Sequence, residues 1–194
     1  MTYEKAGQAQ RRARAVCRNA GFTLVELMVV LAIIAVLVTI GVPGLRDLLV
    51  GNRMNSKLNE WVATIQTTRG SAVKNNLPAL MCKSANGTSC ASSGGWEQGW
   101  LAYVDSDSDG ALDAGEEVFA RGDAASAFSY KGGLATANVI RFGPSGTTNL
   151  DCSTATNCEL RLCIGGEAEG LLVLNVTGRP LATKKARTEV SGCP

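Results

Sequence analysis

A long apolar stretch near the N-terminus constrains this chain more than any other feature. Residues 27–45 are nineteen consecutive uncharged positions, and starting from residue 22 gives 24 residues with a single charge, Glu26. As an α-helix, 24 residues span about 36 Å, which exceeds the ~30 Å hydrocarbon core of a bilayer. One acid and five basic residues precede the stretch: Glu4, Lys5, Arg11, Arg12, Arg14 and Arg18. The positive-inside rule then predicts one transmembrane helix, with the basic segment cytoplasmic and the remainder outside.

The carboxylate of Glu26 is the exception within this stretch. An ionised side chain near the end of a lipid-embedded helix costs on the order of a few kcal/mol unless it has a partner. The run is too long for a secretory signal peptide, and no small-x-small cleavage site follows it, so a plain membrane anchor is the simpler alternative. No basic residue lies within one turn after Glu26. The nearest positive charge would be a free amine made by cutting the chain just before it, which favours a role in processing and assembly.

Residues 21–27, GFTLVEL, resemble the class III signal of type IV pilins and type II secretion pseudopilins. The resemblance implies that a prepilin peptidase removes the basic leader, residues 1–21, by cutting between Gly21 and Phe22, and methylates the new N-terminus at Phe22. It also implies that Glu26 pairs with the N-terminal amine of a neighbouring subunit during assembly. Pro43 stands where the family often kinks its helix. The expected location is the bacterial inner membrane, single-pass with a periplasmic head, and then a pilus or pseudopilus.

Beyond the membrane span, the pattern predicts the rest of one long helix followed by short strands. Spacings of three, four or seven place Leu58, Trp61, Val62, Ile65 and Ala72 on one apolar face, and Pro78 ends the helix by residue 77. Strands are expected at 77–82, 99–104, 117–121, 127–130, 138–142, 160–164 and 171–176. The predicted fold is α+β, a long N-terminal helix packed on a mainly antiparallel sheet or sandwich. The predicted segments are 1–21 (leader), 22–45 (transmembrane), 46–76 (amphipathic) and 77–194 (the head).

The cysteines predict disulfides and an oxidising compartment. Removing the leader removes Cys17 and leaves six, all beyond residue 80. Proximity in sequence pairs Cys82 with Cys90 and Cys152 with Cys158, which leaves Cys163 with Cys193. Six cysteines permit fifteen pairings, so the assignment is a hypothesis based on proximity alone.

Residues 105–116, DSDSDGALDAGE, fit the D-x-D-x-D-G-x5-E pattern of an EF-hand calcium loop. In that pattern alternate side chains converge on one ion, the glycine permits a sharp turn, and the final glutamate closes the site. The candidate ligands are Asp105, Asp107, Asp109, Asp113 and Glu116. Strands rather than helices are expected on both sides, so an acidic hairpin loop without metal is the alternative. No cofactor is required by any other motif.

Several weaker motifs resemble the GspH/FimT group of minor pseudopilins and minor pilins. They are RGSAVKN at 69–75, Trp96 and Trp100 before a strand, F-x-P-x-G at 142–146, and Gly178-Arg179 followed by a late cysteine. Trp96 and Trp100 are most simply core residues. Some FimT-type pilins bind DNA through a C-terminal Gly-Arg-x-Arg motif, and here Leu181 stands in the last position. The basic residues Arg179, Lys184, Lys185 and Arg187 are nevertheless candidates for phosphate contacts, with a solvated basic tail as the alternative.

The absence of histidine removes Ser-His and Cys-His catalysis, and no paired-carboxylate cleft or nucleophile motif appears, so an enzyme is not expected. The favoured function is a minor type IV pilin that primes or joins pilus assembly. The alternatives are a type II secretion minor pseudopilin and a DNA-binding minor pilin for natural transformation. The expected partners are other pilins, prepilin peptidase, the inner membrane and, for the last alternative, DNA.

Overall fold

The computed structural model describes residues 21–152, 155–175, 177–185 and 193 of the chain. It divides into two compact units, Met1–Pro43 and Gly44–Pro194. One helix, α1 (Leu24–Asn75, 52 residues), runs through both, with Pro43 inside it at the boundary. The predicted helix of about fifty residues is thus confirmed. It ends because Asn76 takes a left-handed conformation (φ 52°), a common helix C-terminus, and Pro78 cannot continue a helix.

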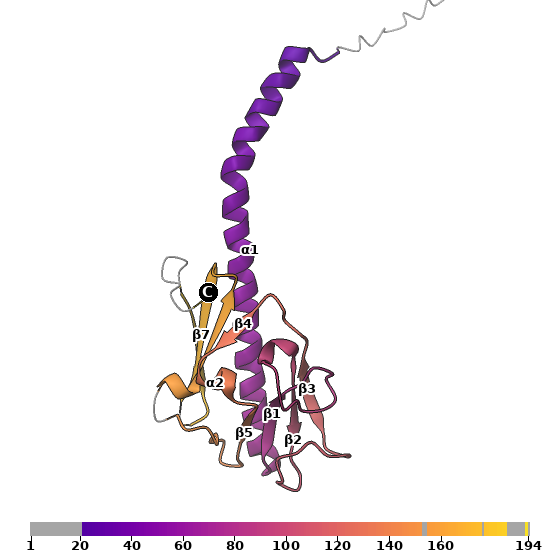
Figure 1. The fold of residues 1–194 in the computed structure, drawn as a ribbon, viewed down its shortest axis with the longest axis vertical. Helices are drawn as coiled ribbons and strands as arrows, with labels where there is room; N and C mark the ends of the chain where they lie inside the picture. Colours follow the sequence, from indigo (N-terminus) through magenta and orange to yellow (C-terminus); the bar gives the residue numbers. More distant parts are fainter. Residues whose placement is uncertain (1–20, 153–154, 176, 186–192, 194) are drawn as a thin grey trace, which may run out of the picture. The chain divides into compact units, whose positions relative to one another are not determined.

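Within the described residues, eight strands follow α1 and form two four-stranded antiparallel sheets. The first sheet has the order β3-β2-β1-β5, from β1 (Ala79–Lys83), β2 (Trp100–Val104), β3 (Val118–Gly122) and β5 (Val139–Phe142). The second has the order β4-β6-β7-β8, from β4 (Ser129–Lys131), β6 (Glu159–Ile164), β7 (Ala168–Leu174) and β8 (Pro180–Lys185). Short helical turns lie at η1 (Trp96–Gln98), α2 (Gly133–Thr136) and η2 (Ala155–Cys158). Figure 1 shows the strands gathered around the C-terminal part of α1, so the predicted α+β class is confirmed.

All seven predicted strands are present, and an eighth, β8, was missed. A strand is not expected at residues 180–185 from sequence, because PLATKK has little of the apolar or β-branched character of a strand. β8 nevertheless pairs antiparallel with β7 along its whole length, from Glu169↔Lys185 to Leu174↔Pro180. It is an edge strand of its sheet, where polar side chains are common.

One hydrophobic core joins the C-terminal part of α1 to both sheets. The helix contributes a stripe spaced by three, four or seven residues: Met54, Leu58, Trp61, Ile65 and Ala72. Four of these five lie on the predicted apolar face, while Val62 is only partly buried and Met54 was overlooked. Two buried threonines on the same face satisfy their hydroxyls locally, since Thr64 and Thr68 donate to the carbonyls four residues earlier, at 2.8 Å each.

The two central strands of the first sheet, β1 and β2, are buried on both faces. Successive residues of β1 and β2 alternate between the main core and a second group, the outer cluster, formed by Leu80, Cys82, Leu101 and Tyr103. Two loops supply the partly buried residues that cover this cluster, with Cys90 from the loop after β1 and Leu112 from the loop after β2. The loops of the head are therefore part of its packing.

Gly170 in β7 sets how closely α1 approaches the second sheet. A Cβ at this position would lie 2.6 Å from Sδ of Met54 and 2.9 Å from a methyl of Leu58, both of which are buried. Gly70 on α1 is the opposite case, because a Cβ there would meet nothing within 4 Å.

We expect the same chemical change to have opposite effects at these two glycines. Gly170→Ala should lower the free energy of unfolding by about 1–3 kcal/mol through overpacking. Gly70→Ala should raise it by about 0.5–1 kcal/mol, because alanine loses less backbone entropy in a helix. Urea unfolding of the full chain in detergent, followed by circular dichroism, measures both. Equal effects of the two variants would contradict close contact between α1 and β7.

Candidate functional site

The predicted processing site lies just before the first turn of α1. Gly21, Phe22 and Thr23 precede the helix, and residues 1–20, the rest of the predicted leader, lie outside the described residues. Oγ1 of Thr23 accepts a hydrogen bond from the backbone N–H of Glu26 at 3.1 Å, as an N-cap threonine does. The peptide bond between Gly21 and Phe22 is therefore in non-helical backbone, and a peptidase need not unwind helix to reach it.

Glu26 occupies the third position of the helix. A carboxylate there is favoured by the positive end of the helix dipole by about 0.3–1 kcal/mol. The Thr-x-x-Glu spacing of Thr23 and Glu26 is that of a capping box. Glu26 therefore has a local role in capping the helix besides its predicted intermolecular role. The Thr-x-x-Glu spacing is the sequence signal for that local role.

The N-terminal part of α1 presents an apolar surface. Residues 21–49 are exposed, and the helix is long and apolar enough to cross a membrane, with a mean hydropathy of 2.8 over its most apolar window. Val29, Ala32, Ile33, Val36 and Leu37 line a shallow groove along it. An apolar surface of this extent is stable only in contact with hydrocarbon or other apolar side chains.

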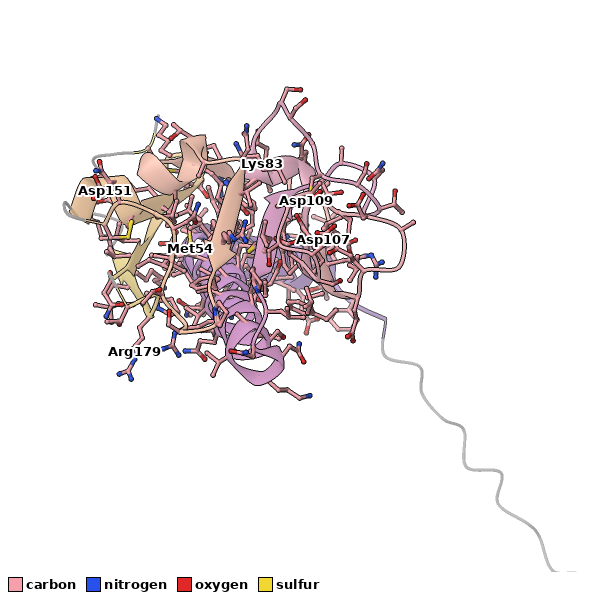
Figure 2. The ribbon with its side chains drawn as sticks, turned by 90° about the horizontal axis from the view of Figure 1, so that it is seen from below. Met54, Lys83, Asp107, Asp109, Asp151 and Arg179 are labelled. Carbon is pink, nitrogen blue, oxygen red and sulfur yellow. A yellow bond between two sulfur atoms is a disulfide. The ribbon has the colours of Figure 1, made fainter. Side chains whose placement is uncertain are left out.

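The acidic loop between β2 and β3 brings three of the five predicted ligands together. One carboxylate oxygen from each of Asp105, Asp107 and Asp109 lies within 4.8 Å of the others. Asp105 is fully buried and the other two are exposed. Figure 2 shows Asp107 and Asp109 close to one another and well separated from Arg179. Burial raises the pKa of Asp105, and the nearby Arg141 guanidinium opposes this rise.

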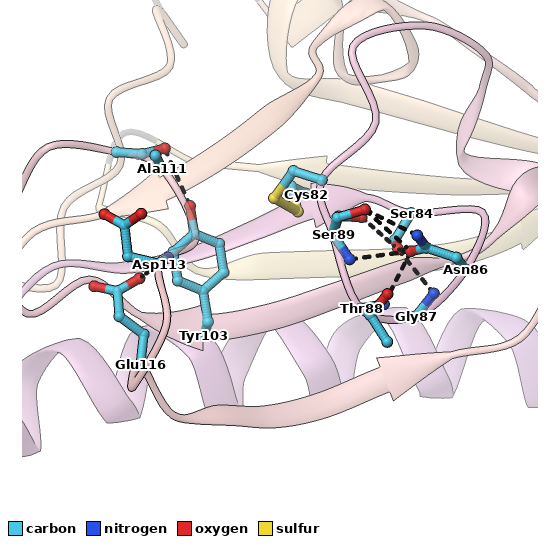
Figure 3. The surroundings of a disulfide bond; sticks show 12 residues. Cys82, Ser84, Asn86, Gly87, Thr88, Ser89, Tyr103, Ala111, Asp113 and Glu116 are labelled. Atoms are coloured by element: carbon cyan, nitrogen blue, oxygen red, sulfur yellow. Dashed lines mark hydrogen bonds between the residues drawn. A yellow bond between two sulfur atoms is a disulfide. The ribbon is translucent and has the colours of Figure 1, made fainter.

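The other two predicted ligands, Asp113 and Glu116, are outside that group of three. The carboxylate of Glu116 accepts hydrogen bonds from the backbone N–H of Ser106 (2.7 Å) and of Asp113 (3.1 Å), which closes the loop on itself. Asp113 is exposed, and the negative charge of Asp109 is the main cause that raises its pKa. Figure 3 shows Asp113 and Glu116 beside the ring of Tyr103.

The three described basic residues of the C-terminal region, Arg179, Lys184 and Lys185, differ in their surroundings. Arg179 is exposed at the turn before β8, and Lys184 is exposed within β8. Nζ of Lys185 lies 2.8 Å from the carboxylate of the buried Glu169. Arg187 lies outside the described residues. Residues 180–185 are therefore a strand of the sheet rather than a tail, while Arg179 and Lys184 are exposed to solvent as the alternative to DNA binding expected.

Arg69 joins motifs that are far apart in the sequence. Its Nε donates to the carbonyl of Gly146 at 2.9 Å and to that of Thr177 at 3.2 Å. Gly178 packs closely here too, since a Cβ on it would lie 2.8 Å from both the carbonyl oxygen of Gly146 and the ring of Phe142. Three of the segments that resemble the GspH/FimT group thus meet at the C-terminal end of α1. The contacts of Arg69 and Gly178, here called the Arg69 junction, hold these segments together and so have a structural role.

Three disulfides link the head. They join Cys82 to Cys90, Cys152 to Cys158 and Cys163 to Cys193, which are the pairs that proximity predicted. Below the first bridge, Figure 3 shows the loop from Ser84 to Ser89, in which Oδ1 of Asn86 accepts from the backbone N–H groups of Thr88 and Ser89. Cys163–Cys193 ties the C-terminal region to β6.

Lys83 is a buried polar residue that the sequence analysis missed. It is 3% exposed, its Nζ lies 3.2 Å from Oδ1 of Asn138, and it sits 5.8 Å from the ring centre of Trp96. Burial lowers its pKa. Trp96 and Trp100 are both buried in the core, in agreement with their expected structural role.

A non-helical segment capped at Thr23, an exposed apolar helix and a disulfide-linked head of two antiparallel sheets define a type IV pilin-like protein. Two family models match: the prokaryotic N-terminal methylation motif at residues 17–42, and type II transport protein GspH at residues 57–178. The chain belongs to the GspH family of pilins and pseudopilins, whose members are structural subunits. Membership implies membrane anchoring by the apolar helix, prepilin peptidase processing and assembly with other pilins.

Two solved structures are similar to this chain, both of the type IV minor pilin FimU of Pseudomonas aeruginosa. One has 16% identity over 71% of this chain and 97% of the other, with a TM-score of 0.46. The second crystal form has 17% identity over 73% and 94%, also with a TM-score of 0.46. No curated protein matches the chain in sequence.

Proposed function

We propose that this chain is a minor type IV pilin that primes or joins pilus assembly. The observation that carries the proposal is the N-terminal segment: a Gly21-Phe22 bond in non-helical backbone, next to a capped helix that has Glu26 in its first turn and continues as exposed apolar surface. Cutting after Gly21 frees the amine of Phe22. The apolar helix then holds the subunit in the inner membrane with its head in the periplasm until a filament takes it up.

The assembly step follows from the cost of a charge in lipid. An ionised Glu26 in the membrane is stable only with an opposite charge, and the free amine of a neighbouring subunit supplies one. Pairing neutralises both groups at once and aligns the two helices in a defined register. Apolar contacts between helices, including the groove at Val29 and Val36, then replace contacts with lipid.

The same subunit organisation serves a type II secretion pseudopilus, which the GspH family description favours as the closest alternative. DNA capture during natural transformation is the second alternative. The exposure of Arg179 and Lys184 supports DNA binding. Lys185 is less suited to it, because it is already paired with Glu169.

A clean deletion strain, complemented with the intact gene, tests the proposal. We expect loss of surface pili and twitching with normal secretion of enzymes and restoration on complementation. Loss of secretion with normal pili would replace the pilus by the pseudopilus. Normal pili with lost DNA uptake would support the DNA role instead.

Mass spectrometry of the purified protein tests the processing step separately. The expected N-terminus is methylated Phe22, and any other start would contradict the assembly role given to its amine.

A further inference from the structure

The loop after β2 holds one carboxylate oxygen that the fold leaves without a partner. Asp105 is fully buried, its backbone N–H donates to the carbonyl of Pro78 at 2.9 Å, and its Oδ2 accepts from the N–H of Gly110 at 3.1 Å. Its Oδ1 is buried and has no hydrogen-bond partner among the described residues. A buried polar atom of this kind is costly and calls for a ligand.

The surroundings of Asp105 point to a cation as that ligand. Carboxylate oxygens of Asp107 and Asp109 lie within 4.8 Å of one from Asp105. Asp113 and Glu116 add two further carboxylates in the same loop, and the positive group that faces Asp105 is Arg141, whose Nη2 lies 3.5 Å from Oδ2. Five carboxylates against this one guanidinium leave a strong excess of negative charge.

We propose that this loop binds a calcium ion through Asp105, Asp107 and Asp109. The donors are all oxygens, which suit hard cations, and no cysteine or histidine lies in the loop to favour a transition metal. A loop that offers several carboxylates suits calcium better than magnesium, which keeps several of its waters. The proposal does not depend on whether the filament is a pilus or a pseudopilus.

The ion would hold the loop over the outer cluster. Leu112 packs against that cluster, and the hydroxyl of Tyr103 donates to the carbonyl of Gly110 at 3.1 Å. The proposed calcium ligands and Leu112, which covers the outer cluster, thus belong to one loop. Neutralising the carboxylates therefore stabilises the packing of β1 and β2, and calcium becomes a stabilising ligand of the head.

Calorimetric titration of the full chain in detergent with calcium chloride tests the proposal. We expect one ion per chain with a Kd of about 10⁻⁴ to 10⁻³ M, as in extracellular calcium modules. The double variant Asp107→Asn/Asp109→Asn should weaken binding at least tenfold. Both residues are exposed, so this variant should fold. Asp123→Asn, an exposed carboxylate outside the loop, is the control and should bind as the wild type does. No heat of binding at millimolar calcium, or equal binding by the double variant, would overturn the proposal.

Thermal unfolding provides a second readout that does not depend on heats of binding. Calcium at about ten times the Kd should raise the Tm by about 2–5 °C, because a ligand of the native state stabilises it. The same concentration of magnesium should raise it less. An equal rise in the double variant would show that calcium acts elsewhere and would refute the site.

Discussion

Glu26→Gln is expected to leave cleavage at Gly21 intact and to reduce incorporation into filaments by at least about a hundredfold. The amide keeps the size of the side chain and removes its charge, so a neighbour's ammonium group would be left unpaired in lipid. Removing one partner of a buried ion pair costs about 3–5 kcal/mol, and each 1.4 kcal/mol is about a factor of ten in an equilibrium. Comparing the variant in sheared filaments with that in the cell membrane measures the effect.

The matched control is Glu117→Gln, which removes one carboxylate from an exposed position of the head. It should enter filaments as the wild type does. Mass spectrometry on the membrane fraction establishes that Glu26→Gln starts at Phe22. If a correctly cleaved Glu26→Gln protein entered filaments normally, the ion pair would not be needed for assembly.

Trp61→Ala is expected to destabilise the unit Gly44–Pro194 by about 3–5 kcal/mol, the range for removing a large buried aromatic side chain. Trp61 is 1% exposed and lies where three other aromatic rings converge, with ring centres 5.3 Å away at Trp96, 6.5 Å at Trp100 and 5.8 Å at Tyr130. The first pair is edge-to-face, a favourable geometry. The loss should lower the Tm by about 6–20 °C for a unit of this size.

Val73→Ala, a truncation at an exposed position of the same helix, controls for effects on α1 itself. It should change the Tm by a degree or two at most. Near-ultraviolet circular dichroism follows the aromatic cluster directly. If Trp61→Ala and Val73→Ala had the same Tm, Trp61 would not be the centre of the core.

The arrangement of the acidic loop could be predicted only in part from the sequence. The spacing of Asp105, Asp107 and Asp109 was sufficient to predict that their carboxylates converge, because the pattern acts over a few residues. The buried position of Asp105 also involves contacts with Pro78 and Arg141. Both come from other segments of the chain, so no local pattern could reveal it.

The edge strand β8 and the contacts of Arg69 could not be predicted from the sequence for the same reason. β8 forms because β7 offers an unpaired edge, and its own residues, PLATKK, carry no strong strand signal. Arg69 was recognised only by resemblance, since its acceptors at Gly146 and Thr177 lie 77 and 108 residues later.

By itself, the sequence was sufficient to predict the apolar span, the end of α1 before Pro78, the two short-range cysteine pairs and the convergence of Asp105, Asp107 and Asp109. Each of these depends on residues within about one or two turns, or on composition. The tertiary structure alone decided that β8 is a strand, that Lys185 pairs with Glu169, and that the buried Asp105 has one oxygen without a hydrogen-bond partner among the described residues. Such features arise from contacts between distant segments, which form only when the two sheets and α1 pack around one core.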